Sequence, residues 1–181
     1  MGYAAPMQIG TGLRQRIYSR AFLVASASNT TSAMDRILYV VIDQQGGDTA
    51  IRQQVLERLS VLYPHLYTQN NFALASTNSH SGPGAYSNYM LLQLTTLGVD
   101  KQSFKAIVDG IVLSVQRAHE SAGEGYLYLG RGVVEDAGVN RSPYSYEQNP
   151  LEEIEKYRDI GHTDKEMQML MFTDRNGDIM G

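Results

Sequence analysis

Three runs of apolar residues in the first half of the chain predict β-strands. They cover residues 17–25, 36–42 and 71–76, and they include β-branched and aromatic side chains. The run at 36–42 is nearly continuous in apolar residues, which is typical of a buried strand. We therefore expect these segments to pair in one sheet.

Two segments repeat apolar residues at the spacing of an α-helix. Asp48 is a favourable N-cap for the first helix, and Asp100 opens the second. A shorter apolar stretch at 89–97 also fits a helix. The apolar faces hold Ile51, Val55, Leu59 and Leu62 in the first helix, and Phe104, Ile107, Val108, Ile111, Val115 and Ala118 in the second. Strands and helices that alternate in this way predict an α/β fold (α+β layered), with a mixed sheet and flanking helices.

The C-terminal third of the chain is more polar. Residues 126–130 and 132–134 predict a pair of short strands, residues 138–165 predict irregular structure, and residues 166–173 predict a further strand. The sequence Asp-Arg-Asn-Gly at 174–177 is typical of a hairpin turn. Because the chain ends soon after this turn, we expect its return strand to be cut and the chain to be an incomplete part of a larger domain.

Composition narrows the class of protein. Hydrophobic residues make up 43% and charged residues 19%, which is enough to bury a core and excludes a disordered tail. The net charge of −4 and the scattered Lys and Arg argue against nucleic acid as a partner. The absence of cysteine excludes disulfides and thiolate metal sites. No apolar run reaches the roughly 18 residues that a membrane helix needs, so we expect no transmembrane segment.

The polar loop at 76–84, Ser-Thr-Asn-Ser-His-Ser-Gly-Pro-Gly, is the strongest candidate for a functional site. It follows a predicted strand, and ligands bind at the carboxyl ends of strands in open α/β sheets. His80 lies among small residues, and Gly82 would let the backbone approach a ligand closely. Taken alone, the loop fits a tight turn with a hydrogen-bonded His equally well. It also fits an anion-binding nest, although the lysine of a phosphate loop is missing.

Other polar residues have a simpler interpretation. Asp43 follows a predicted buried strand and could bind a cation, but capping a loop is the favoured interpretation. We expect structural roles for His65 and His119 near the ends of helices. Arg141 is different, because an Arg in a loop flanked by aromatic residues can anchor a carboxylate or an amide oxygen.

The loop at 76–84 resembles the T-H-x-H-S-G-P-G signature of the neutral/alkaline (non-lysosomal) ceramidases. Three further blocks resemble segments of that family in the same order: GLRQRIYSRAF, NRSPYSYEQNP and TDKEM. The resemblance spans essentially the whole chain. The segments GLRQR and GDTAIR are most similar to fungal members.

The resemblance implies a zinc-dependent amidohydrolase that cleaves the N-acyl bond of ceramide to sphingosine and a fatty acid. In that family one zinc ion is held by two His, a Glu and a Tyr, and it activates a water and polarises the carbonyl. Carried over, His80 is a catalytic residue, Arg141 is catalytic and binds substrate, and Gly82 belongs to the substrate site. Asn78 stands where the first zinc-ligand His is expected. The remaining ligands would lie beyond residue 181, so residues 1–181 would be a truncated N-terminal part of the catalytic domain, inactive alone.

The substitution at Asn78 leaves a second interpretation open. An Asn side chain is a poor zinc ligand compared with a neutral imidazole. The protein could therefore be an inactive ceramidase-like pseudo-enzyme or a lipid-binding protein. Either way, the resemblance implies ceramide or a related sphingolipid as partner, a membrane surface reached through that substrate, and a parent protein that is secreted or membrane-associated.

Overall fold

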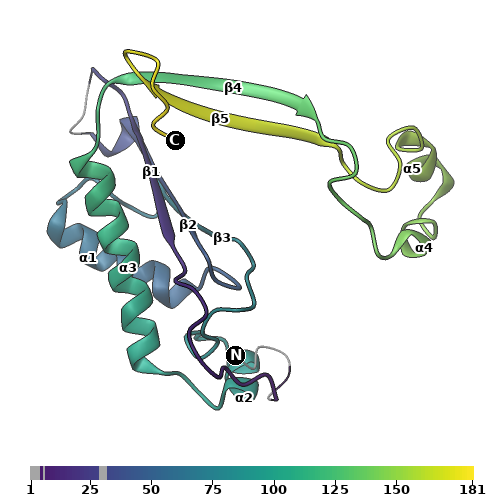
Figure 1. Cartoon of the computed structure of the whole chain (residues 1–181), viewed down its shortest axis with the longest axis horizontal. Coiled ribbons are helices and arrows are strands. Elements are labelled where there is room, and N and C mark those ends of the chain that lie inside the picture. Colours follow the sequence, from purple (N-terminus) through teal and green to yellow (C-terminus); the bar gives the residue numbers. More distant parts are fainter. Residues whose placement is uncertain (1–4, 6, 29–31) are drawn as a thin grey trace. The chain divides into compact units, whose positions relative to one another are not determined.

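The structure of the protein, a computed structural model, describes residue 5, residues 7–28 and residues 32–181 (Figure 1). These residues fall into two compact units, one up to Ala122 and one from Gly123 onward. Within the described residues, no helix is both long and apolar enough to cross a membrane.

A three-stranded mixed sheet forms the centre of the first unit. Its strands lie in the order β1 (Ser19–Ala25), β2 (Arg36–Ile42) and β3 (Phe72–Ser76), and a short 3-10 helix, η1 (Ala33–Asp35), precedes β2. β2 is antiparallel to β1 and parallel to β3. The predicted mixed sheet is confirmed, although β1 begins two residues later than the apolar run that predicted it.

Three helices accompany this sheet: α1 (Thr49–Leu62), α2 (Met90–Thr96) and α3 (Lys101–Glu120). The carboxylate of Asp48 accepts hydrogen bonds from the backbone N–H groups at the start of α1, and Asp100 does the same for α3. Such caps satisfy donors that have no partner within the helix. Both predicted N-caps and all three predicted helices are confirmed.

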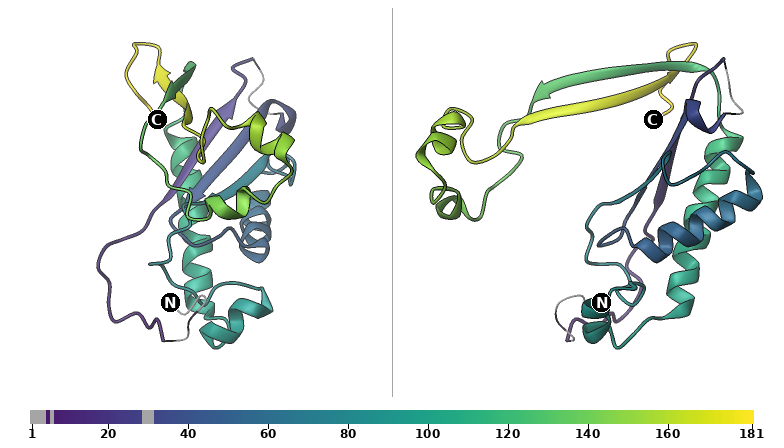
Figure 2. Two further views of the ribbon diagram at one scale, coloured as in Figure 1. Left: turned by 90° about the vertical axis from the view of Figure 1, so that its right-hand side faces the viewer. Right: turned by 180° about the vertical axis from the view of Figure 1, so that it is seen from behind.

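The core lies between one face of the sheet and the two longer helices, α1 and α3 (Figure 2). Residues alternate along β2, so that Leu38, Val40 and Ile42 are buried while Ile37 and Tyr39 on the other face are exposed. The helices add Ile51, Val55, Leu59, Val108, Ile111, Val112 and Val115 to this core. The helical spacing therefore identified the buried faces correctly, except that Leu62 in the last turn of α1 is exposed.

The second unit is built on a two-stranded antiparallel ribbon. β4 (Gly125–Val133) pairs along its whole length with β5 (Glu166–Asp174). The prediction of two short strands within 126–134 is therefore wrong. β4 continues through Gly130 and Gly132 because β5 supplies a hydrogen-bonding partner at each of these positions. That partner is distant in sequence, and a local pattern cannot show it.

The sequence predicted irregular structure for residues 138–165, between these strands, and this prediction is wrong in part. It holds two short helices, α4 (Pro143–Tyr146) and α5 (Leu151–Lys156). Pro143 opens α4, where its fixed φ angle and missing N–H suit the first helical position. Neither helix is long enough to produce a repeating apolar pattern.

The predicted hairpin turn follows β5. The N–H of Gly177 donates to the carbonyl of Asp174, and the Asp174 side chain accepts from the N–H groups of Asn176 and Asp178. Gly177 has a φ of +92°, which glycine adopts at low cost. After the turn, Ile179 forms an isolated bridge with Thr173.

Candidate functional site

The carboxyl ends of β2 and β3 lie side by side in the first unit, because these strands are parallel and Ile42 pairs with Ser76. The residues that follow each strand therefore meet at one edge of the sheet. The N–H of Thr77 donates to the carbonyl of Ile42 (3.0 Å), and the N–H of Ser79 donates to the carbonyl of Gln44 (3.1 Å). These bonds hold the loop after β3 against the residues after β2.

Asn78 and His80 lie together on this loop, and both are exposed. The Nε2 atom of His80 is 3.1 Å from the Oδ1 atom of Asn78, within hydrogen-bonding distance. Asn78 has a φ of +57°, in the left-handed region. Asn tolerates this region better than most residues do, so the local backbone suits the residue found there.

Gly82 is buried beside the first residues after β2. A Cβ atom built on Gly82 would lie 2.8 Å from Oε1 of Gln44 and 3.5 Å from the carbonyl oxygen of Asp43. The close approach expected at this glycine is thus present, but it is made to Gln44. A role for Gly82 in binding substrate stays a prediction.

Gln44 was not among the residues singled out from the sequence. Its side chain is only 2% exposed, and its Oε1 atom has no hydrogen-bond partner among the described residues. The signal that could have found it is positional: a polar residue just after a buried strand, here the second one, lies at the edge where the candidate loop is expected.

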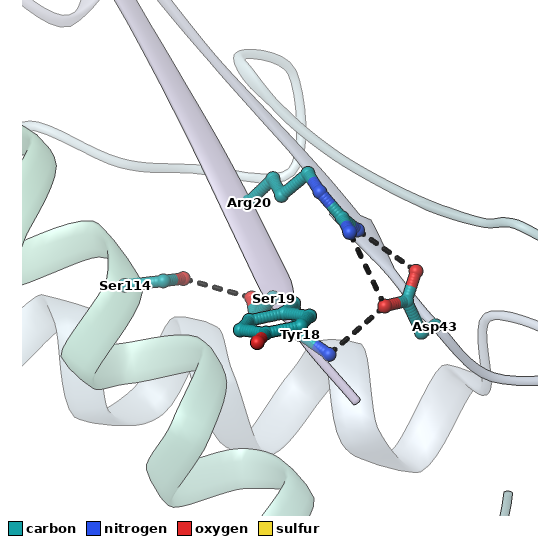
Figure 3. A network of polar contacts seen from close by, with 5 residues as sticks. All are labelled: Tyr18, Ser19, Arg20, Asp43 and Ser114. Carbon is teal, nitrogen blue, oxygen red and sulfur yellow. Dashed lines mark hydrogen bonds and ion pairs between the residues drawn. The ribbon is translucent and has the colours of Figure 1, made fainter. Parts of the chain in front are cut away.

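Asp43 connects the end of β2 to the start of β1 (Figure 3). Its carboxylate accepts hydrogen bonds from the N–H of Tyr18 (2.9 Å) and from the guanidinium of Arg20 (2.8 Å). The hydrogen bond from Arg20 is the main cause that lowers the pKa of this carboxyl. The hydroxyls of Ser19 and Ser114 lie 2.8 Å apart and join β1 to α3. Asp43 thus caps the N–H of Tyr18, as its position favoured, and is also ion-paired with Arg20.

A cavity of about 240 Å³ opens next to this edge of the sheet. Its walls are mainly apolar, with Ile107 of α3 and Pro83 of the loop among them, and Asp43, Gln44 and Ser103 add polar groups. Such a lining can accommodate a hydrocarbon group with a polar group at its end.

Arg141 belongs to the second unit, whereas Asn78, His80 and Gly82 belong to the first. It is exposed and directly precedes the residue that caps α4. The N–H of Ser142 donates to Oδ1 of Asn140 (2.9 Å), which fixes the backbone on either side of Arg141. The structure thus brings three of the four predicted site residues together and describes the fourth in a separate unit.

Of the two histidines interpreted as structural, His119 is packed against aromatic residues. His119 stacks on Tyr63 with ring centroids 4.0 Å apart, and its Nε2 atom lies 2.5 Å from the hydroxyl of Tyr67. Burial, and secondly the charge of Arg36, lower the pKa of His119. His65 is exposed two residues beyond Tyr63, the C-cap of α1, with a φ of +64°, and its structural role stays a prediction.

The residues that the structure describes do not gather into a metal site. Among the described residues, no three His, Cys, Asp or Glu side chains are grouped so that they could hold a metal ion. Asn78 offers only an amide, and its oxygen is hydrogen-bonded to His80. A zinc site would therefore require ligands from beyond the described residues.

The first unit is an α/β domain with a mixed sheet. Its candidate site is the histidine loop at the carboxyl ends of the two parallel strands. The family described as "Neutral/alkaline non-lysosomal ceramidase, N-terminal" matches residues 1–181. The chain belongs to this family.

Known members of the family are similar over nearly the whole chain. A neutral ceramidase of Oryza sativa subsp. japonica is 41% identical over 174 residues, which are 96% of this chain and 21% of that protein. Neutral ceramidase 3 of Arabidopsis thaliana is 41% identical over 175 residues, 96% of this chain and 23% of that protein. The likeness to fungal members stays a prediction.

The fold is also that of a solved relative. The crystal structure of neutral ceramidase from Pseudomonas aeruginosa matches with a TM-score of 0.88 and 38% sequence identity, over 99% of this chain and 27% of that one. The chain thus spans about a fifth to a quarter of the length of the relatives it matches.

Proposed function

We propose that the protein is a neutral ceramidase-like amidohydrolase, and that this chain is the N-terminal part of its catalytic domain. The observation that carries the proposal is the match of the whole chain to the ceramidase family, together with a candidate loop at the ligand-binding edge of the sheet. In the proposed reaction, water adds to the amide carbon of ceramide and the C–N bond breaks. The products are a fatty acid and sphingosine.

The two candidate catalytic residues have separate tasks in this proposal. His80 is exposed on the loop after β3, so its imidazole is accessible to a bound substrate. It orients the substrate or transfers a proton to the nitrogen that leaves as an amine. Arg141 binds the polar head of ceramide or the carboxylate that forms, which its planar, permanently charged guanidinium suits. Both roles rest on the family resemblance and require the remainder of the protein to complete the site.

Zinc belongs to this proposal as an expectation from the family. When bound, the ion would supply an activated water and polarise the amide carbonyl. The chain's own contribution at the position of the first ligand is the amide of Asn78, which is a poor ligand. We propose ceramide or a related sphingolipid as the substrate, reached at a membrane surface, in a parent protein that is secreted or membrane-associated.

A second candidate function is an inactive ceramidase-like pseudo-enzyme or lipid-binding protein. The observation that favours it is the hydrogen bond between Asn78 and His80, because this bond occupies the Asn78 oxygen within the protein. Asn78→Ala would provide no zinc ligand at residue 78 under either candidate function, so it does not distinguish them. Asn78→His does, because it introduces the imidazole that the family resemblance predicts there. Hydrolysis of ceramide that appears only in the full-length Asn78→His protein would support the pseudo-enzyme.

The experiment that tests the leading proposal compares two histidines of the same unit. The full-length protein is incubated with ceramide that carries a labelled acyl chain, and the released fatty acid is measured. His80→Gln should lower the rate by about 100-fold or more, as loss of a positioned acid–base group does. His65→Gln is the matched control, because His65 is also exposed but lies outside the candidate site, and it should retain the rate. Equal rates for both variants would overturn the role of His80.

A further inference from the structure

Gln44 contacts the candidate loop on both sides of His80. Its main-chain carbonyl accepts a hydrogen bond from the N–H of Ser79, the residue just before His80. Its side-chain oxygen lies against Gly82, two residues after His80. The loop therefore meets one buried residue at two points, with His80 between them.

The contact with Gly82 depends on the length of the Gln44 side chain. Gly82 has no positive φ, so its backbone would accept a larger residue without strain. A methyl group there would nevertheless come within 2.8 Å of Oε1 and 3.3 Å of Cδ of Gln44, and both atoms belong to the side chain. Gln44 is buried, so the space available to a side chain at residue 82 depends on the size of residue 44.

Gln44 itself is held firmly by the sheet. It is the second residue after β2, and its N–H donates to the carbonyl of Ile42 (2.9 Å), while Ile42 also accepts from Thr77. The carbonyl of Ile42 thus accepts hydrogen bonds from the N–H groups of both Gln44 and Thr77, which lies near the start of the loop. Ser79 is in turn bonded to the carbonyl of Gln44, so the loop is attached directly to this residue.

We propose that Gln44 is a positioning residue that clamps the loop at Ser79 and Gly82 and so fixes the place of His80 and its hydrogen bond to Asn78. The inference rests on the proposed function only for what His80 does in a reaction. The clamp itself is a statement about geometry. It predicts that the effect of enlarging Gly82 depends on the size of residue 44.

The test measures the position of His80 without any need for catalysis. The full-length protein is treated with diethyl pyrocarbonate, and the rate of carbethoxylation of His80 is followed by peptide mass spectrometry, with exposed His65 as the internal reference. Gly82→Ala should raise the His80 rate about fivefold, the factor expected when one ordinary hydrogen bond is lost. In the Gln44→Ala background the same change should alter the rate by less than about twofold.

Two further variants separate the clamp from general damage to the fold. Gln44→Met keeps a long side chain, so Gly82→Ala should again raise the rate about fivefold in that background. Gly46→Ala is the matched glycine control, because nothing lies within 4 Å of a Cβ built there, and it should leave the His80 rate unchanged. An equal effect of Gly82→Ala in all three backgrounds, or no effect in the natural one, overturns the proposal.

Ceramide hydrolysis by the same variants reports separately on the proposed function. If the carbethoxylation rate of His80 depends on the size of residue 44 but no ceramide is hydrolysed, the clamp is supported and the proposed function is overturned. If the natural protein hydrolyses ceramide but the carbethoxylation rate of His80 does not depend on residue 44, the proposed function stands and the clamp is overturned.

Discussion

The Oδ1 atom of Asn78 lies 3.1 Å from the Nε2 atom of His80, and Asn78 makes this contact from the left-handed region of the backbone, with a φ of +57°. Asn78, the position where the family resemblance predicts a zinc-ligand histidine, is thus hydrogen-bonded to His80. Side-chain chemistry and backbone conformation both suit Asn at this position.

The left-handed conformation of Asn78 predicts an order of stability for two substitutions. Asn78→Ala and Asn78→Gly both remove the hydrogen bond to His80, but only Gly adopts a positive φ freely. We expect the Ala variant to be less stable than the Gly variant by about 1 kcal/mol. Urea unfolding of the full-length variants, followed by fluorescence, measures the difference. An Ala variant as stable as the Gly variant would show that residue 78 does not hold this conformation in solution.

Asp48 connects the start of α1 to the segment after the candidate loop. One carboxylate oxygen accepts from the N–H groups of Ala50 and Ile51, and the other accepts from the hydroxyl of Ser87 (3.1 Å) and the N–H of Asn88 (3.0 Å). Asp48 is only 3% exposed, so its removal leaves several buried donors without a partner.

We expect Asp48→Ala to lower the free energy of unfolding by about 3 kcal/mol, the sum of a lost cap and lost buried hydrogen bonds. Asp100→Ala is the matched control, since Asp100 caps α3 but is exposed, and its carboxylate bonds to Gln102 and Ser103 of its own helix. Its loss of stability should be clearly smaller in the same denaturation experiment. Equal losses for the two variants would mean that the contacts of Asp48 with Ser87 and Asn88 add nothing.

His119 predicts a dependence of stability on pH. Burial is the main cause that lowers its pKa in the folded protein below the ordinary value of 6.5. As the pH falls below about 6.5, the unfolded chain therefore binds a proton before the folded chain does. By linkage, the free energy of unfolding falls as the pH is lowered from about 6.5 through the folded pKa, and it is unaffected by this group at higher pH.

The comparison that isolates this effect uses His119→Gln, which cannot be protonated but can still bond to the hydroxyl of Tyr67. The natural protein should lose more stability than this variant between pH 7.5 and pH 5. Thermal unfolding at the two pH values measures the loss. A variant with the same loss as the natural protein would show that His119 is not the group responsible.

The first unit could be predicted from the sequence because its elements carry their own signals. Asp48 and Asp100 mark helix starts through local hydrogen bonds, and Val55 and Val108 belong to apolar repeats that face the sheet. The second unit could be predicted less well. The pairing of Gly130 with Met169 joins residues far apart in the sequence, and a local pattern contains no information about that partner.

The candidate site could be predicted only in part. The loop with His80 was found from its place after a strand and from its resemblance to a family signature. Gln44 was not found, because its importance comes from the parallel pairing that places Ile42 beside Ser76. Proximity of this kind depends on the register of two strands, which the sequence of neither strand shows alone.

The measurement that tests the central claim most directly is ceramide hydrolysis by the full-length protein with its natural Asn78. The account predicts release of labelled fatty acid and of sphingosine in equal amounts, and loss of both products in the His80→Gln and Arg141→Ala variants. No release from the natural protein would contradict the proposal that this protein hydrolyses ceramide, and release only after Asn78→His would support the pseudo-enzyme instead.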